Sequence, residues 1–388
     1  EDGLSPDAVT FCSILKACSM IGSTAKGKEI HAEARNRGLL TANVVLGNAL
    51  VDMYAKCGVL AKAQEVFDEL PVKDVVAWSA LISGYTQHGL AEKALACFRA
   101  MINEGISPNV VTFTCILKAC GMIGSLDMGE EIYAEVKKQR LLEKDVMLGN
   151  TLVDMYAKCG RLVKARDVFN KLPIQNVVSW NALIDGYVQK GLIDEAIICL
   201  KHMQEDGFAP DSVSFACILK GCSAMKGEEI HAKACKERLL GKDPLLGNAI
   251  IYMYVRCGRL LKAREVFDEL AERNVVSWNA LISGYAQNGL GDEALKCFRH
   301  MQNVGVRPDA RTYACVLKSC GIVRSLEIGE EINAEIRKEG LLRKDIVLGN
   351  ALVGMYSKCG ALEKAQEVFE QLPERNAGSW NALIAGYI

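Results

Sequence analysis

The stretch VVSWNALIDGY at residues 177–187 occurs four times in the chain, with small changes each time. Its tryptophan recurs at intervals of 102, 98 and 102 residues, as Trp78, Trp180, Trp278 and Trp380. Recurrence at a nearly fixed spacing is typical of repeat proteins, in which each unit packs mainly against its neighbours. We therefore interpret the chain as an array of similar units rather than as two or three ordinary domains.

Three shorter units make up each long period, and they have 35, 36 and 31 residues. One unit is shortened to 32 residues around GCSAMKGEEI at 221–230, which accounts for the 98-residue interval. We expect a single solenoid over 1–388, with eleven complete units and a fragment at each end: 1–7, 8–43, 44–74, 75–109, 110–145, 146–176, 177–211, 212–243, 244–274, 275–309, 310–345, 346–376 and 377–388.

Each unit has the pattern of two helices. In 44–74, apolar residues such as Leu50 and Met53 fall on one helical face, Gly58 interrupts the run, and a second amphipathic segment ends at Pro71. A hairpin of this size cannot cover its own apolar face, so neighbouring units must stack. No unit has the period of two that is typical of a strand. The sequence predicts an all-α solenoid of helix-turn-helix repeats.

Composition limits the possible partners. The chain is 50% hydrophobic, its formal net charge is −1, and no apolar run approaches the length of a membrane helix. The net charge argues against non-specific coating of nucleic acid but leaves room for a local basic stripe. We expect no membrane partner. The first residues do not resemble a transit peptide, and the last copy of the motif is incomplete, so we expect both ends to be cut from a longer chain.

Cysteine and histidine do not indicate a catalytic or metal site. Fourteen of the sixteen cysteines are copies of four repeat positions, and we interpret them as small core residues with reduced thiols. The triplet HAE at 31–33 matches half of the zinc deaminase signature, but the other half, P-C-x-x-C, is absent. We therefore predict no enzyme activity, no metal and no cofactor for this chain.

Two positions in each unit carry small polar residues within a nearly constant apolar frame. An Asp or Asn at the end of a unit is explained by capping of the next helix, whereas a polar residue at the fifth position is not, and this favours a role in binding. The pairs of fifth and last residues are Asn48 with Asp74, Ser79 with Asn109, Thr114 with Asp145, Asn150 with Asn176, Asn181 with Asp211, Asn248 with Asn274, Asn279 with Asp309, and Asn350 with Asn376.

A basic residue stands eight positions after the fifth residue in each 31-residue unit. Residues spaced by four share one face of a helix, so this cation lies on the same face as the fifth residue and is a candidate phosphate contact. The four residues are Lys56, Lys158, Arg256 and Lys358.

The unit VVSWNALISGYAQNGLGDEALKCFRHMQNVGVRPD at 275–309 strongly resembles a pentatricopeptide repeat (PPR). The alternation of lengths resembles the PLS subclass of plant organelle RNA-editing factors, with P repeats of 35, L repeats of 36 and S repeats of 31 residues. This resemblance makes 212–243 a short L repeat, and 1–7 and 377–388 parts of P repeats. It implies a right-handed superhelix in which each repeat binds one base of single-stranded RNA.

In that family the fifth and last residues select the base, and the second residue wedges between neighbouring bases. Arg311 departs from the apolar pattern of second residues. The other second residues are Val45, Val76, Val111, Met147, Val178, Val213, Leu245, Val276 and Val347.

The resemblance also implies a base code. Pairs of Asn with Asp should prefer uridine, pairs of Asn with Asn a pyrimidine (Y), Ser79 with Asn109 adenine, and Thr114 with Asp145 guanine. Cys12, Ala216 and Ala314 offer no selector. With the RNA 5′ end toward the protein's N-terminus, the expected RNA is N-U-A-(G)-Y-U-N-Y-U-N-Y.

By this resemblance the chain is the recognition array of a C-to-U RNA-editing factor of a plant chloroplast or mitochondrion. The chemistry would come from a DYW-type cytidine deaminase domain, in cis or in trans, together with other editing factors. Two alternatives stay open. One is a PPR RNA binder that acts in RNA stability, splicing or translation, and the other is a protein-interaction scaffold.

Overall fold

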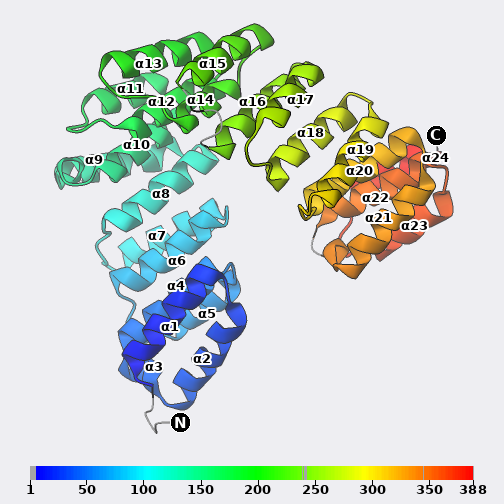
Figure 1. Cartoon of the computed structure of the whole chain (residues 1–388). Helices are drawn as coiled ribbons and strands as arrows, with labels where there is room; N and C mark the ends of the chain where they lie inside the picture. The colour runs from blue at the N-terminus through cyan, green and yellow to red at the C-terminus, as the bar shows by residue number, and fades with distance from the viewer. Residues whose placement is uncertain (1–5, 238, 240–242, 344, 388) are drawn as a thin grey trace. The chain divides into compact units, whose positions relative to one another are not determined.

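The computed structural model describes residues 6–237, 239, 243–343 and 345–387, and within these residues it contains helices and no strand (Figure 1). The prediction of an all-α fold is confirmed. The chain divides into two compact units, Glu1–Ala209 and Pro210–Ile388. The single continuous solenoid expected over 1–388 stays a prediction.

The first unit contains α1 to α13 and the short 3₁₀ helix η1 between α9 and α10. Their bounds are α1 (Ala8–Ile21), α2 (Thr24–Asn36), α3 (Leu39–Ala42), α4 (Val44–Lys56), α5 (Leu60–Glu69), α6 (Val75–Gln87), α7 (Ala91–Asn103), α8 (Val110–Ile123), α9 (Leu126–Lys138), η1 (Leu141–Glu143), α10 (Val146–Lys158), α11 (Leu162–Asn170), α12 (Val177–Gln189) and α13 (Ile193–Glu205).

The second unit contains α14 to α24 and η2. Their bounds are α14 (Ser212–Leu219), α15 (Ala224–Lys236), α16 (Pro244–Arg256), α17 (Leu260–Glu269), α18 (Val275–Gln287), α19 (Gly291–Asn303), α20 (Ala310–Val323), α21 (Leu326–Lys338), η2 (Leu341–Arg343), α22 (Ile346–Lys358), α23 (Leu362–Gln371) and α24 (Ala377–Tyr387).

Each repeat is a helical hairpin whose first helix begins at the first residue of the repeat. The Asp or Asn just before it is the N-cap, and its side chain accepts hydrogen bonds from the backbone of the first turn. Asp74, for example, accepts from Val76 N at 3.0 Å and from Ala77 N at 2.9 Å. Gly58 has φ of 77° after α4, a conformation that favours glycine and turns the chain into α5.

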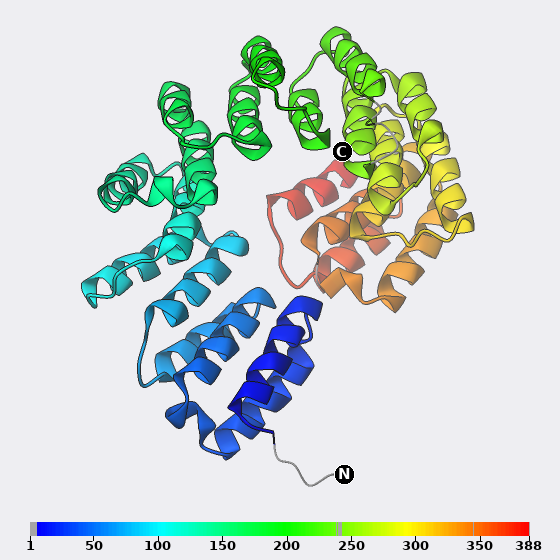
Figure 2. The same cartoon turned by 60° about the vertical axis from the view of Figure 1, so that its left-hand side comes forward.

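Within each unit the first helices of successive repeats contact one another and form a continuous layer (Figures 1 and 2). In the first unit this layer runs from α1 through α4, α6, α8 and α10 to α12. In the second it runs from α14 through α16, α18, α20 and α22 to α24. The second helix of each hairpin packs on this layer, and the core lies between them.

An aromatic contact joins each 31-residue repeat to the repeat that follows it. Phe67 of α5 lies edge-on to Trp78 of α6, with ring centroids 4.6 Å apart, and both rings are buried. The same contact recurs between Phe169 and Trp180, Phe267 and Trp278, and Phe369 and Trp380. Such pairs add to the stability gained from burial alone.

The shortened repeat 212–243 has a first helix of only 8 residues, against 14 in α8. The guanidinium of Arg256 donates to the carbonyl oxygens of Leu219 at 3.3 Å, of Cys222 at 2.6 Å and of Lys220. Helix ends leave carbonyl groups without partners, so Arg256 satisfies those where α14 stops early.

The cysteines are all free thiols, of which seven are buried, eight are partly exposed and one, Cys235, is exposed. Cys120 and Cys320 are fully buried, and burial, followed by the neighbouring thiols of Cys159 and Cys359, raises the pKa of each to about 12. Among the described residues no group of three or more His, Cys, Asp or Glu side chains is placed to hold a metal ion. None of the described helices has the length and apolarity needed to cross a membrane.

Candidate functional site

The fifth and last residues of a repeat form a direct hydrogen-bonded pair. The amide nitrogen of Asn48 donates to both carboxylate oxygens of Asp74, at 3.0 and 3.1 Å. Equivalent amide contacts join Asn279 to Asp309 at 3.0 Å, Asn150 to Asn176 at 3.2 Å, Asn350 to Asn376 at 3.2 Å, and Asn248 to Asn274 at 3.5 Å. The two positions that the sequence singled out are therefore one structural feature in these five repeats.

The same oxygen of the last residue also caps a helix. Oδ1 of Asp309 accepts from Thr312 N at 2.8 Å and from the amide of Asn279. Burial raises the pKa of Asp309, but the hydrogen bonds from Thr312 and Asn279 outweigh it and leave the pKa below its usual value. Capping and pairing thus occur together, and capping alone does not describe this position.

The third residue of the following repeat reaches the pair as well. Thr312 Oγ1 donates to Asn279 Oδ1 at 2.6 Å, and Ser379 Oγ donates to Asn350 Oδ1 at 2.6 Å. Ser79 also shares a 2.7 Å hydrogen bond with a third residue, Thr112. These hydroxyl groups orient the fifth side chain, and sequence reasoning missed them. A Ser or Thr at the third helical position after an Asp or Asn N-cap was the available signal.

Other fifth residues keep an unused acceptor. The Oδ1 atoms of Asn48, Asn150 and Asn248 are buried and have no hydrogen-bond partner in the described residues. An unpartnered buried acceptor is costly, which suits a group that gains its partner from a ligand.

Three pairs differ from this arrangement. Ser79 Oγ lies 3.5 Å from Asn109 Oδ1, at the limit of a hydrogen bond. Thr114 instead donates to Val110 O of its own helix at 2.8 Å, while Asp145 caps α10 through Leu148 N, also at 2.8 Å. Asn181 and Asp211 belong to different compact units, so each is described only within its own unit.

The second residues form a row of exposed apolar side chains beside these pairs. Exposed apolar residues in a series mark a binding surface more often than isolated ones do. Arg311 is also exposed. Val9, the second residue of 8–43, belongs to the row with 71% exposure and was not among the predicted residues. The predicted members, Val45, Val76, Val111, Met147, Val178, Val213, Leu245, Val276 and Val347, are between 41% and 67% exposed.

The four predicted cations have three different environments. The ammonium of Lys56 lies 2.7 Å from Asp52, and that of Lys158 lies 2.7 Å from Asp154. Arg256 donates to the end of α14, as described above. At Lys358 the residue four positions earlier is Gly354, and among the described residues no carboxylate pairs with this lysine.

This arrangement defines a helical-hairpin repeat protein that presents a hydrogen-bonded polar pair in five of its repeats, beside an exposed apolar row. The chain matches the PPR repeat family at 73–122, 175–224 and 273–321, and the PPR repeat at 48–75, 111–141, 150–177, 248–275 and 350–376. Together these stretches cover more than half of the chain, which belongs to the pentatricopeptide repeat family.

The chain is similar to several pentatricopeptide repeat-containing proteins of Arabidopsis thaliana. A chloroplastic one is 35% identical over 381 residues, which are 97% of this chain and 61% of that protein. A second is 35% identical over 98% of this chain and 55% of its own length. A mitochondrial one is 33% identical over 100% of this chain and 56% of its own length. The chain thus spans less than two thirds of each relative.

Solved structures of maize PPR10 are also similar to this chain. The protein alone aligns with a TM-score of 0.50 and 22% identity, over 99% of this chain and 67% of that chain. A second structure, with 20% identity and a TM-score of 0.50 over the same shares, holds PPR10 in complex with an 18-nucleotide psaJ RNA element. At this identity the likeness concerns the fold.

Proposed function

We propose that the chain is a sequence-specific binder of single-stranded RNA that reads one base per repeat. The observation that carries the proposal is the hydrogen-bonded pair of fifth and last residues, which recurs with polar side chains beside an exposed apolar row. Edges of unstacked bases need fixed donors and acceptors, and their faces need apolar surfaces to stack on. Five of the repeats supply both.

The capped helix explains why the pair suits base recognition. Backbone N–H groups bind Oδ1 of the last residue and keep it an acceptor, so the fifth Asn must turn its amide nitrogen toward it. The orientation of an otherwise ambiguous amide is thereby fixed. A base meets a defined pattern of donors and acceptors, which is a requirement for discrimination.

We further propose that the array belongs to the PLS subclass and serves a C-to-U editing factor in a chloroplast or mitochondrion. Support comes from the 35, 36 and 31-residue alternation and from the chloroplastic and mitochondrial relatives. In this proposal the chain itself recognises RNA, and a DYW-type deaminase domain, in cis or in trans, supplies the chemistry.

Selection from a random RNA pool tests the recognition step. We expect enrichment of N-U-A-(G)-Y-U-N-Y-U-N-Y, and an enriched 11-nucleotide RNA should bind more tightly than a scrambled RNA of the same composition. Equal affinity for the two RNAs would contradict one-base-per-repeat reading. Absence of RNA binding would instead favour a protein-interaction scaffold.

A reconstituted reaction tests the editing step. The chain would be combined with a DYW-type deaminase domain and an RNA that carries the expected sequence followed by cytidines. We expect conversion of cytidine to uridine in this RNA and none in the scrambled RNA. Sequence-specific binding without conversion would favour a role in RNA stability, splicing or translation.

A further inference from the structure

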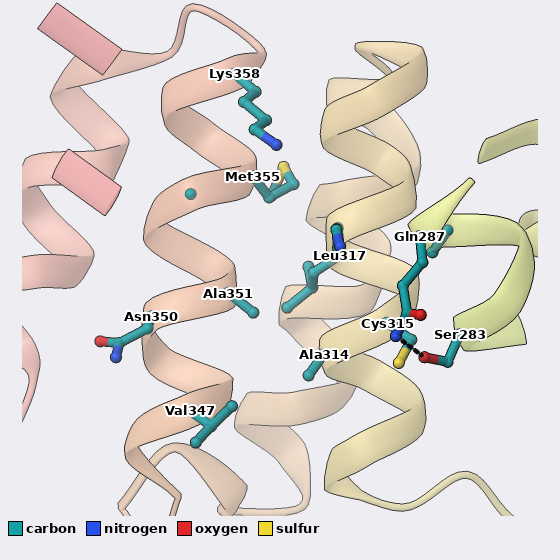
Figure 3. Close-up of a pocket in the computed structure, with 13 residues that line it drawn as sticks. Ser283, Gln287, Ala314, Cys315, Leu317, Val347, Asn350, Ala351, Met355 and Lys358 are labelled. Carbon is teal, nitrogen blue, oxygen red and sulfur yellow. Dashed lines mark hydrogen bonds between the residues drawn. The ribbon is translucent and has the colours of Figure 1, made fainter. Parts of the chain in front are cut away.

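A cavity of 430 Å³ opens between the first helices of three successive repeats, α18, α20 and α22 (Figure 3). Pockets that bind small ligands usually have volumes of about 300–1,000 Å³. Its walls are formed largely by Leu317 of α20 and by Ala351 and Met355 of α22, and Lys358 stands at one end. Val347, a member of the exposed apolar row, lies at the other end.

The chain contains its own comparison for this cavity, because the same three repeats occur 200 residues earlier. Eight of the thirteen lining residues are identical in the two copies. At the other five positions the residue that lines the cavity is smaller than its counterpart in the earlier copy. Ala286, Ala314, Val347, Ala351 and Gly354 stand where the earlier copy has Thr86, Thr114, Met147, Thr151 and Asp154. These replacements all remove volume, and four of them also remove a polar group.

The replacement at Gly354 changes charge as well as volume. In the earlier copy the carboxylate of Asp154 holds the ammonium of Lys158 at 2.7 Å. Gly354 offers no such carboxylate, so Lys358 is available to an external anion at the mouth of an apolar cavity. An apolar cavity with a cation at its edge fits an aromatic ring that is attached to an anionic group, which is the chemistry of a nucleotide.

The fifth residue of repeat 310–345 is Ala314, which has no side-chain group to read a base edge. The side chain of Asn350 does not face the cavity, and Figure 3 shows it pointing away. Its amide donates to Asn376, and its Oδ1 accepts from Ser379. Asp345, the last residue of this repeat, caps α22 through Val347 N and Leu348 N, so without a polar fifth residue we expect shape and apolar contact to contribute to selection here.

We propose that this cavity receives a purine base of the bound RNA, at the nucleotide opposite repeat 310–345, and that Lys358 contacts the adjoining phosphate. The inference rests on the proposed RNA binding. It assigns a base preference to repeat 310–345, for which the base code predicts none. A purine fills the cavity better than a pyrimidine because it buries more ring surface.

The test uses the 11-nucleotide RNA with its tenth position changed to adenine, guanine, cytosine, uracil or an abasic site. Stacking of one base is worth enough to change affinity about fivefold or more. We expect the purine RNAs to bind at least about fivefold more tightly than the abasic RNA, with the pyrimidine RNAs between them. Equal affinity across this series would overturn the proposal, whatever the behaviour of any variant.

The matched variant combines Ala314→Thr with Gly354→Asp, which installs two of the five residues by which the earlier copy differs. A Cβ at Gly354 would meet only Ala382 Cβ, at 3.8 Å, so the second change fits the helix. We expect the variant to lose the purine preference at the tenth position, because the cavity is smaller and Lys358 is paired with the new carboxylate. A variant that folds and keeps the preference would contradict the proposal.

The ninth position separates this inference from the proposed function. Asn279 and Asp309 face that nucleotide and should prefer uridine in both the parent and the variant. A uridine preference there without a purine preference at the tenth position would defeat only the cavity proposal. Loss of preference at both positions in the parent protein would defeat one-base-per-repeat reading itself.

Discussion

Asn48 and Asp74 are 26 residues apart in the chain, yet the amide of the first donates to both carboxylate oxygens of the second. In the proposed base recognition Asp74 acts with the repeat that contains Asn48, and in the structure it caps the first turn of α6. The substitutions Asp74→Asn and Asp74→Ala separate these two roles. Asn caps helices about as well as Asp, so Asp74→Asn should leave the free energy of unfolding nearly unchanged.

We expect Asp74→Asn to relax the preference for uridine at the second nucleotide so that cytidine is also accepted, as expected for pairs of Asn with Asn. Asp74→Ala should lower the free energy of unfolding by about 1 kcal/mol, through loss of the cap. Denaturant unfolding and binding of RNAs with uridine or cytidine at position two measure both effects. An unchanged preference in Asp74→Asn would show that the last residue does not select the base.

Asn181→Thr should move the preference at the sixth nucleotide from uridine toward guanine, because it recreates the Thr and Asp combination found at Thr114 and Asp145. Binding of RNAs that differ only at this position measures the shift. The melting temperature should stay close to that of the parent. A general loss of affinity for all RNAs, with the fold intact, would argue against a base-selective role.

Arg256→Ala should destabilise the protein, because it leaves carbonyl oxygens at the end of α14 without their donor. We expect the free energy of unfolding to fall by about 1 kcal/mol. Lys56→Ala is the matched control, since Lys56 occupies the same repeat position but forms only an exposed ion pair with Asp52, worth a few tenths of a kcal/mol. Equal effects of the two substitutions on stability would refute the capping role.

Asp154→Ala should strengthen RNA binding, because it releases Lys158 from its ion pair. For single strands, each added phosphate contact steepens the dependence of log affinity on log salt concentration by about 0.7. Lys358→Ala should reduce this slope by a similar amount. Titrations at several salt concentrations measure both slopes, and a Lys358→Ala slope equal to that of the parent would remove Lys358 from the phosphate contacts.

His31 links stability to pH. Its Nδ1 lies 3.1 Å from the hydroxyl group of Tyr54, its Nε2 is buried without a partner in the described residues, and burial lowers its pKa. His31 therefore binds a proton more readily in the unfolded chain than in the folded protein. The stability contributed by neutral His31 is present above the usual histidine pKa of about 6.5 and is lost as the pH falls below it.

The chain supplies a control for this pH dependence. Asn333 occupies the position of His31 in a later repeat and donates to Tyr356 at 3.0 Å. His31→Asn should therefore keep the contact with Tyr54 and reduce the loss of stability between about pH 7.5 and 5.5. Unfolding curves at these two pH values test the expectation. His231, which has the same environment, should give the same result.

The start of each first helix was predictable, because an Asp or Asn precedes it and apolar residues at helical spacing follow it. The ion pair between Lys56 and Asp52 was also visible as a spacing of four, although we interpreted that lysine only as a phosphate contact. Sequence could not show whether the hydroxyl group of Ser179 or Ser379 reaches the fifth residue. Ser179 donates to Asn176 O and Ser379 to Asn350 Oδ1, and the choice depends on side-chain rotation.

The sequence also could not show that Arg256 donates to the carbonyl groups at the end of α14. Its partners lie 34 to 37 residues earlier in the chain, and they need a donor only because repeat 212–243 is four residues short. The cavity beside Lys358 depends on five small differences spread over three repeats. Each difference is unremarkable in the sequence, and only their convergence in space creates a site.

The contact between Phe267 and Trp278 occurs once in every three repeats, and this sets the length by which such an array can be altered. Removal of a single 35-residue repeat would bring the phenylalanine of the preceding 31-residue repeat against a repeat without the tryptophan, whereas removal of three successive repeats would restore the contact. The module for shortening, lengthening or recombining this protein is therefore the full period of three repeats, and under the proposed reading of one base per repeat its reach along RNA would change in steps of three nucleotides.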